Sequence, residues 1–357
     1  MSFIKDPINY AYFNVKVVAK KAKLLQFGDY DRLIKTSNVE EIARNLSNTT
    51  YGEIGLTQKL IEQKEPITSQ EIDGLMTDDF QKHIIDLTKH LPRIAQKFAY
   101  KFCKKFYYDS LKVIIRSKHL NLEKKEFKSY VRSPNIEEMD TLNRLMDYNN
   151  LTQIIDVIPE WKIRKILLEA IPIYEQTNTS TVLEQAINIG YYSEIWKEAA
   201  SLGVQALPAL RLIGTEIDLI NIETILRSKL MGMERESIQR WLIPIKYRIG
   251  SFDLYLSAKP LDIINILYNS NYRDFANRVQ EIIESGDELN LSLYEQAMKQ
   301  YVIHQAIKAF RGITFNLGTF YAYFILKRVE FENVRAIIIG KISNLSQDAI
   351  KDMIQIW

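Results

Sequence analysis

The stretch DLINIETILRSK at residues 218–229 decides the fold of this chain, because it occurs three times. An earlier copy reads SLKVIIRSK at 110–118, and a later copy reads EFENVRAIIIGK at 330–341. When Ser110, Asn221 and Asn333 are aligned, the copies are 111 and 112 residues apart. Each copy has a polar start, an apolar middle and a basic finish, and basic residues favour the negative end of a helix dipole. The stretch therefore predicts the last turns of three similar helices.

The residues after each copy indicate where these helices end. Asn121, Gly232 and Asn344 fall in register, each eleven residues after the aligned polar position. Asn and Gly are the residue types that end helices in the left-handed conformation.

A repeat of about 111 residues is too long for a solenoid unit and has the size of a small domain. Helix breakers at Ser133–Pro134 and between Pro244 and Gly250 indicate boundaries. We therefore predict three related helical domains at 1–134, 135–246 and 247–357. A chance match is the alternative, since Ile-rich helices that end in Arg or Lys are common.

A second pattern recurs at twice this period. Leu46 precedes Tyr51 by five residues, and Leu267 precedes Tyr272 by the same interval, 221 residues later. In the middle third, Ile187 and Tyr192 have this spacing but lie out of register.

Composition favours an all-α fold. Only 13 Gly and 9 Pro occur in 357 residues, which suits long helices. We expect them near 9–27, 37–46, 91–118, 161–173, 182–189, 207–229, 292–311, 320–339 and from a cap at Ser346 onward, with capping boxes at Ser37–Glu40 and Thr68–Glu71. The apolar stripe expected along the first helix is Val15, Val18, Ala19, Ala22 and Leu25. The net charge of +3 gives no case for a nucleic-acid partner.

The single cysteine, Cys103, allows no internal disulfide, so we expect a reducing compartment. The first twelve residues lack the pattern of a signal peptide. The apolar runs stop at about seven residues, far short of the ~18 that span a bilayer. We expect a protein outside the lipid that is able to sit against a membrane protein.

The sequence contains no recognisable catalytic, cofactor-binding or metal-binding motif. The glycines are scattered, so no phosphate-binding loop occurs. The four histidines lack metal-ligand spacing and are interpreted as surface or capping residues: His83, His90, His119 and His304. Cys103 has no partner cysteine and is interpreted as a packing residue.

The polar residues inside the repeated stretch have two interpretations. Asp218 and Asn221 align with Glu330 and Asn333, and each pair lies on one helix face. They form either a contact surface that recurs around an axis or a hydrogen-bonded pair that holds two helices of one domain in register. We favour the buried pair, because buried polar groups need partners wherever a fold recurs.

Three motifs in order resemble one known family. They are YAYFNVKV at 10–17, Leu46 with TTY at 49–51, and ENVRAI at 332–337 with Gly340 and Lys341. The chain resembles, from end to end, the central-stalk subunits of archaeal and vacuolar rotary ATPases, called the C subunit in the A-type synthase and the d subunit in the vacuolar pump. The first motif is more similar to the archaeal and bacterial branch. Ile339 departs from the arginine of the other two copies, Arg116 and Arg227.

The resemblance implies a funnel of three similar domains around a pseudo-threefold axis. It implies a non-catalytic rotor subunit at the cytoplasmic face of the membrane, peripheral through its complex. Its partners would be the membrane proteolipid ring and central shaft subunits of the D and F type, with no nucleic acid and no small-molecule substrate. It would transmit torque for proton- or sodium-linked ATP synthesis or hydrolysis. The alternative is a soluble all-helical adaptor unrelated to rotary ATPases.

Overall fold

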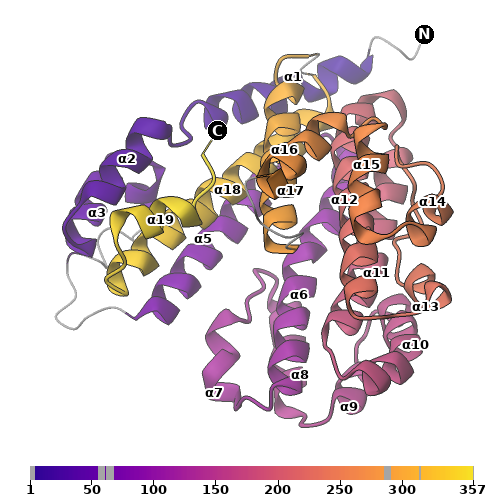
Figure 1. Cartoon of the computed structure of the whole chain (residues 1–357). Coiled ribbons are helices and arrows are strands. Elements are labelled where there is room, and N and C mark those ends of the chain that lie inside the picture. Colours follow the sequence, from indigo (N-terminus) through magenta and orange to yellow (C-terminus); the bar gives the residue numbers. More distant parts are fainter. Residues whose placement is uncertain (1–4, 55–60, 62–67, 285–290, 313–314, 357) are drawn as a thin grey trace. The chain divides into compact units, whose positions relative to one another are not determined.

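The fold is all-α, as predicted. The computed structural model describes residues 5–54, 61, 68–284, 291–312 and 315–356, and every regular element within these ranges is helical (Figure 1). The described residues form two compact units. The middle unit contains Glu160–Ala322 with the start of the first helix, and the terminal unit joins Ile8–Pro159 to Tyr323–Trp357.

The terminal unit brings the two halves of its sequence into shared cores. Phe80, Phe102, Phe324 and Phe331 form one aromatic cluster, with Phe102 and Phe324 edge to face at 4.7 Å between ring centroids. A second core joins Tyr30 and Ile42 to C-terminal apolar residues. Its helices are α1 (Lys5–Lys21), α2 (Phe27–Lys35), α3 (Val39–Leu46), η1 (Thr50–Ile54), α5 (Ser69–Thr88), η2 (Arg93–Ala95), α6 (Gln96–His119), α7 (Lys124–Phe127), η3 (Lys128–Tyr130), α8 (Ile136–Asp147), α9 (Leu151–Asp156), most of α18 (Leu317–Ile342) and α19 (Gln347–Met353).

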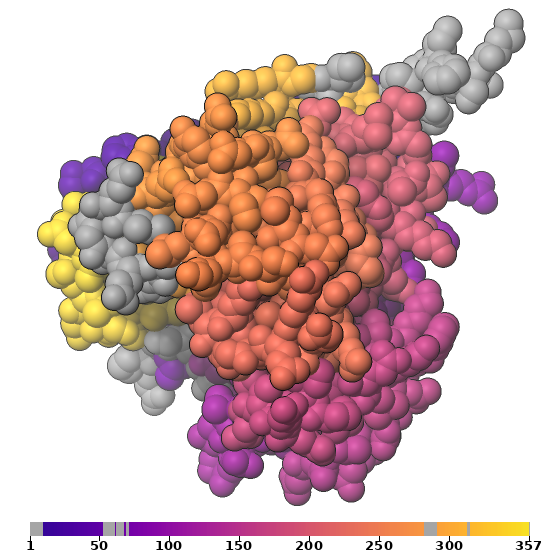
Figure 2. Space-filling view, turned by 45° about the vertical axis from the view of Figure 1, so that its right-hand side comes forward, coloured from indigo at the N-terminus to yellow at the C-terminus, as the bar shows by residue number. Residues whose placement is uncertain are grey.

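The middle unit is built around a helix that is buried on most of its surface, α12 (Leu207–Leu230). The chain around it contains α10 (Trp161–Thr177), α11 (Thr181–Ala200), η4 (Gly203–Ala206), α13 (Arg235–Arg240), α14 (Phe252–Ser257), α15 (Pro260–Tyr268), α16 (Arg273–Glu284), α17 (Leu291–Ala309) and the start of α18. Gly214 lets the loop after α13 approach α12, since a Cβ there would lie 2.4 Å from the ring of Tyr247. The orange side chains of α14 to α17 form one continuous surface in Figure 2.

The three repeated stretches lie at the ends of α6, α12 and α18, as predicted. Asn121, Gly232 and Asn344 have positive φ angles of 54°, 72° and 55°. The next residue in each case donates its N–H to a carbonyl five residues back: Leu122 to Ser117, Met233 to Ser228, and Leu345 to Gly340. This is the Schellman pattern that satisfies the last carbonyls of a helix. A short helix then follows each end and buries one apolar side chain: Phe127, Ile238 and Ile350.

Two local predictions were wrong in detail. The cap of α3 is Asn38, whose side chain accepts the N–H of Glu41, one residue later than the predicted Ser37–Glu40 box. Of the apolar stripe predicted for the first helix, Val15, Val18, Ala19 and Ala22 are exposed and Leu25 is buried. The buried face of α1 consists instead of Tyr10, Phe13 and Val17. Both patterns have helical spacing, so spacing alone did not identify the buried face. The capping box Thr68–Glu71 and the cap Ser346 are confirmed.

Candidate functional site

One polar side chain in each repeated stretch fastens the long helix to the chain 22 residues later. The Ser110 hydroxyl donates to the Arg132 carbonyl (2.6 Å) and accepts the Arg132 N–H (2.8 Å). Asn221 makes the same pair of bonds to Ile243 at 3.0 and 2.8 Å. Asn333 makes them to Gln355 at 2.6 and 2.9 Å. We call each of these double contacts a polar clamp, and each holds the segment after a long helix against that helix.

Beside two of the clamps lies a fully buried carboxylate bonded to a tyrosine. Asp218 accepts the backbone N–H of Tyr247 (2.9 Å) and of Arg248 (2.6 Å) and the hydroxyl of Tyr272 (2.6 Å). Burial raises the pKa of the Asp218 carboxyl, and the hydrogen bond from Tyr272 opposes this rise.

The carboxylate of Glu330 accepts the Leu25 N–H (2.6 Å), the Tyr51 hydroxyl (3.1 Å) and the Lys327 ammonium (2.6 Å). Tyr51 and Tyr272 are the two tyrosines of the second sequence pattern, so that pattern marks a shared contact. At the aligned position of the first copy, a buried tyrosine, Tyr107, replaces the acid.

The lysine that ends each of the last two copies also bonds to a backbone carbonyl. Lys229 donates to the Leu256 carbonyl in α14 (2.6 Å), and Lys341 donates to the Thr36 carbonyl at the end of α2 (2.8 Å). The prediction that the polar residues of the repeated stretch are buried and hydrogen-bonded is thus confirmed. The prediction that they join two helices of one domain is not, because Asn221, Asn333 and Asp218 bond to segments outside the helices. The interpretation as a contact surface is wrong, because these acids and amides are at most 2% exposed.

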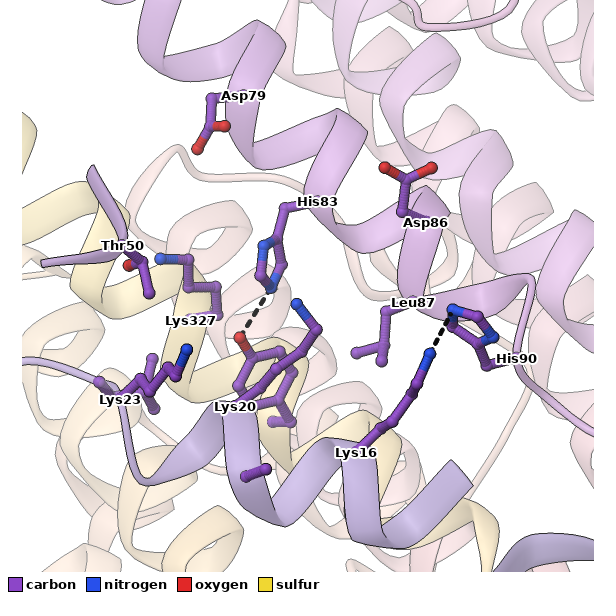
Figure 3. A pocket seen from close by; sticks show the side chains of 13 residues that line it. Lys16, Lys20, Lys23, Thr50, Asp79, His83, Asp86, Leu87, His90 and Lys327 are labelled. Atoms are coloured by element: carbon purple, nitrogen blue, oxygen red, sulfur yellow. Dashed lines mark hydrogen bonds between the residues drawn. The ribbon is translucent and has the colours of Figure 1, made fainter. Parts of the chain in front are cut away.

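The terminal unit contains a cavity of about 410 Å³ that is rich in basic side chains (Figure 3). Lys16 and Lys20 reach it from α1, Lys23 from the following loop, and Lys327 from α18. The remaining lining residues come from α5, η1, α1, α18 and the turns beside them: Ala19, Leu24, Thr50, Asp79, His83, Asp86, Leu87, His90 and Tyr323.

The imidazole of His83 is held neutral in this cavity. Its Nε2 lies 2.8 Å from the Tyr323 hydroxyl. Burial, together with the charges of Lys327 and Lys20, lowers the pKa of His83 to about 3. Lys16 Nζ lies 3.0 Å from Nε2 of His90 at the cavity edge. Two histidines thus share one cavity.

The cavity was not predicted from the sequence. His90 and His304 are exposed, as expected, but His83 is half-buried and bonded to a residue 240 positions later. Its neighbours come from segments distant in sequence, and the only signal was the run of lysines in α1. Cys103 is half-buried on α6, and burial raises the pKa of its thiol to about 12, which disfavours the reactive thiolate.

Within the described ranges, no group of three or more His, Cys, Asp or Glu side chains is arranged to hold a metal ion. None of the helices in these ranges is both long enough and apolar enough to cross a bilayer.

The family of this chain follows from a comparison with known proteins. The model of the ATP synthase (C/AC39) subunit family matches residues 13–353. The chain belongs to this family. The match extends over every clamp residue and every cavity residue described above except Gln355, so these features lie almost wholly inside the C/AC39 region.

Three similar curated proteins come from archaea. The C/AC39 chain is 24% identical to the C subunit of the A-type ATP synthase of Methanocaldococcus jannaschii over 98% of this chain and 87% of the relative. It is 23% identical to that of Methanosphaera stadtmanae over 97% and 87% of the two chains. With that of Haloferax volcanii it shares 21% identity over 96% of both. The resemblance to the A-type C subunits is thereby confirmed.

Proposed function

We propose that this chain is a non-catalytic rotor subunit in the central stalk of an A/V-type ATP synthase or ATPase. The observation that carries the proposal is the family match over residues 13–353, together with relatives named as C subunits of A-type ATP synthases that align along nearly the whole chain. In this role the chain joins the membrane proteolipid ring to shaft subunits of the D and F type. It lies peripherally at the cytoplasmic face of the membrane and passes torque between proton or sodium flow and ATP synthesis or hydrolysis.

The polar clamps support a mechanical role. A part that transmits torque must not yield internally, and close-packed helices have low compressibility. Each clamp uses two hydrogen bonds to hold a long helix against the segment that follows it. Buried bonds of this kind keep their geometry, because breaking one leaves a desolvated polar group without a partner. Force applied to one end of α12 or α18 is therefore passed to neighbouring segments.

We also propose that the chain forms three related domains, at 1–134, 135–246 and 247–357, arranged as a funnel. Recurrence of the clamp, the Schellman ending and the following short helix supports the relationship. Small-angle scattering of the purified chain tests the arrangement, since a compact funnel and an extended array of three domains have different radii of gyration.

Co-purification tests the rotor function. The tagged chain is mixed separately with D- and F-type shaft subunits and with detergent-solubilised proteolipid ring from the same source. We expect stable complexes with both, and a ternary assembly when all components are present. Folded chain that binds neither component would refute the proposal and favour a soluble adaptor.

A further inference from the structure

The basic cavity of the terminal unit has the composition of an anion-binding site. Ammonium groups from α1, from the loop after it and from α18 surround one space, with the hydroxyls of Thr50 and Tyr323 on its wall (Figure 3). Groups from separate segments that converge on one cavity differ from a row of lysines on a solvated helix face. A concave site with an excess of one sign of charge concentrates ions of the opposite sign.

The charge balance of the site is positive even when neighbouring charges are included. Four lysines and two aspartates line the cavity. The charged groups acting on them add Lys82 beside Asp79, Lys89 paired with Asp86, and Glu330 paired with Lys327. The total is six ammonium groups against three carboxylates. In addition, burial raises the pKa of Asp79, which disfavours its negative charge.

The size and walls of the cavity restrict the anion. A volume of about 410 Å³ is in the range of small-molecule sites and exceeds what a single inorganic ion needs. Lysine ammonium groups are flexible point charges that suit phosphate oxygens. Several of them around one cavity match a ligand with several adjacent negative charges. Ala19, Leu24 and Leu87 add an apolar wall that would accommodate an organic group next to the charges.

We propose that this cavity binds a soluble polyphosphate anion, either inorganic pyrophosphate or the phosphate chain of a nucleotide. Lys16, Lys20 and Lys23 contact the phosphate oxygens, and the hydroxyl of Thr50 donates to them. The bound anion ties α1 and the loop after it to η1, so it stabilises the terminal unit in proportion to its occupancy. The site goes beyond the proposed rotor function and does not depend on assembly into a complex.

Calorimetric titration of the full chain with pyrophosphate, ATP, AMP and inorganic phosphate, at one fixed salt concentration, tests this proposal. We expect pyrophosphate or ATP to bind at least about tenfold more tightly than inorganic phosphate, because more ammonium groups are engaged. Tighter binding of ATP than of pyrophosphate would assign the apolar wall to the nucleoside. Similar binding of the two would assign the site to the phosphate chain alone.

Two charge-matched triple variants separate the cavity from general attraction. In the first, Lys16, Lys20 and Lys23 are changed to Gln. In the second, Lys21, Lys35 and Lys125, which lie outside the cavity in the same unit, are changed to Gln. We expect the cavity variant to weaken binding on the order of 100-fold and the control variant to weaken it less than about threefold.

Three outcomes would overturn the proposal. They are an equal loss in both triple variants, no binding of pyrophosphate or ATP at millimolar concentration, and binding only to vesicles that contain anionic lipid. Because the triple cavity variant risks loss of α1 packing, its helix content is checked by circular dichroism. The single variant Lys23→Gln, at an exposed position, provides a second measurement, with an expected loss of about tenfold.

Discussion

The carboxylates of Asp218 and Glu330 occupy aligned positions, but they are satisfied in different ways. In the middle unit, Asp218 binds two backbone N–H groups and a tyrosine from the chain that follows α12. In the terminal unit, Glu330 binds Leu25 and Tyr51 from the other end of the chain and a buried lysine, Lys327. The buried carboxylate of the repeated stretch therefore takes its partners from the following chain in the middle unit. In the terminal unit it takes two of its partners from the N-terminal part of the chain, and so holds the two ends of the sequence together.

The largest effect is expected from Glu330→Ala, because it leaves the ammonium of Lys327 buried without its carboxylate. Breaking a buried ion pair from one side costs about 3–5 kcal/mol of unfolding free energy. Asp218→Ala leaves neutral donors only, so we expect a smaller loss of about 1–3 kcal/mol. Urea unfolding of both variants measures the difference. Adding Lys327→Met to Glu330→Ala should recover part of the loss, and equal losses at Asp218 and Glu330 would break the comparison.

Truncation of the clamp side chains sharpens the comparison next. Asn221→Ala and Asn333→Ala each remove two hydrogen bonds and leave a backbone N–H and C=O without this partner, so we expect losses of roughly 2 kcal/mol in unfolding free energy. Ser110→Ala also removes two bonds, but the side chain of Gln81 lies 3.5 Å from the Arg132 carbonyl as a second donor, so we expect a smaller loss of about 1 kcal/mol. Glu332→Ala, which removes a half-buried side chain on the same helix as Asn333, provides the control and should cost less than either asparagine change. A larger loss of unfolding free energy from Ser110→Ala than from either asparagine change would contradict this prediction.

His83 gives the terminal unit its own pH dependence. The pKa of His83 is about 3 in the folded chain, against an ordinary value of 6.5 that applies in the unfolded chain. As the pH falls, the unfolded chain therefore takes up a proton first. The contribution of His83 to the free energy of unfolding is present above pH 6.5 and is lost between pH 6.5 and pH 3. Lowering the pH by about two units from pH 6.5 should therefore lower the free energy of unfolding by about 2 kcal/mol. His83→Gln should remove this dependence and His90→Gln, at an exposed position, should not; identical pH profiles for all three proteins would contradict it.

The smallest effect, with the opposite sign, is expected at Asp218 in the middle unit. Burial raises its pKa above the ordinary value of 3.8, so the folded chain holds the proton more tightly than the unfolded chain. The contribution of this group to stability is therefore lost as the pH rises from about 3.8 through the folded pKa. The difference in unfolding free energy between wild type and Asp218→Asn, measured from about pH 4 to 7, should shift against wild type. A flat difference would indicate an unshifted carboxyl.

Prediction from sequence succeeded where a residue type has one local use. Asn121, Gly232 and Asn344 marked helix ends because a left-handed residue there costs Asn and Gly little. Thr68 and Ser346 marked helix starts because their hydroxyls accept a nearby N–H. Prediction failed along α1, where two faces have helical apolar spacing and only packing against other helices buries Tyr10, Phe13 and Val17.

The sequence by itself determined the helical class, the recurrence of one stretch at a fixed period and the places where the three long helices stop, because these depend on backbone conformation within a few residues. It also carried enough similarity to identify the C/AC39 family. Only the tertiary structure decided which segments bond to the buried carboxylates of Asp218 and Glu330. It also decided that α1, α5 and α18 bring their charged side chains to one cavity. Such contacts join residues 305 positions apart in the case of Leu25 and Glu330. They depend on which helices pack together, and local residue patterns do not specify that choice.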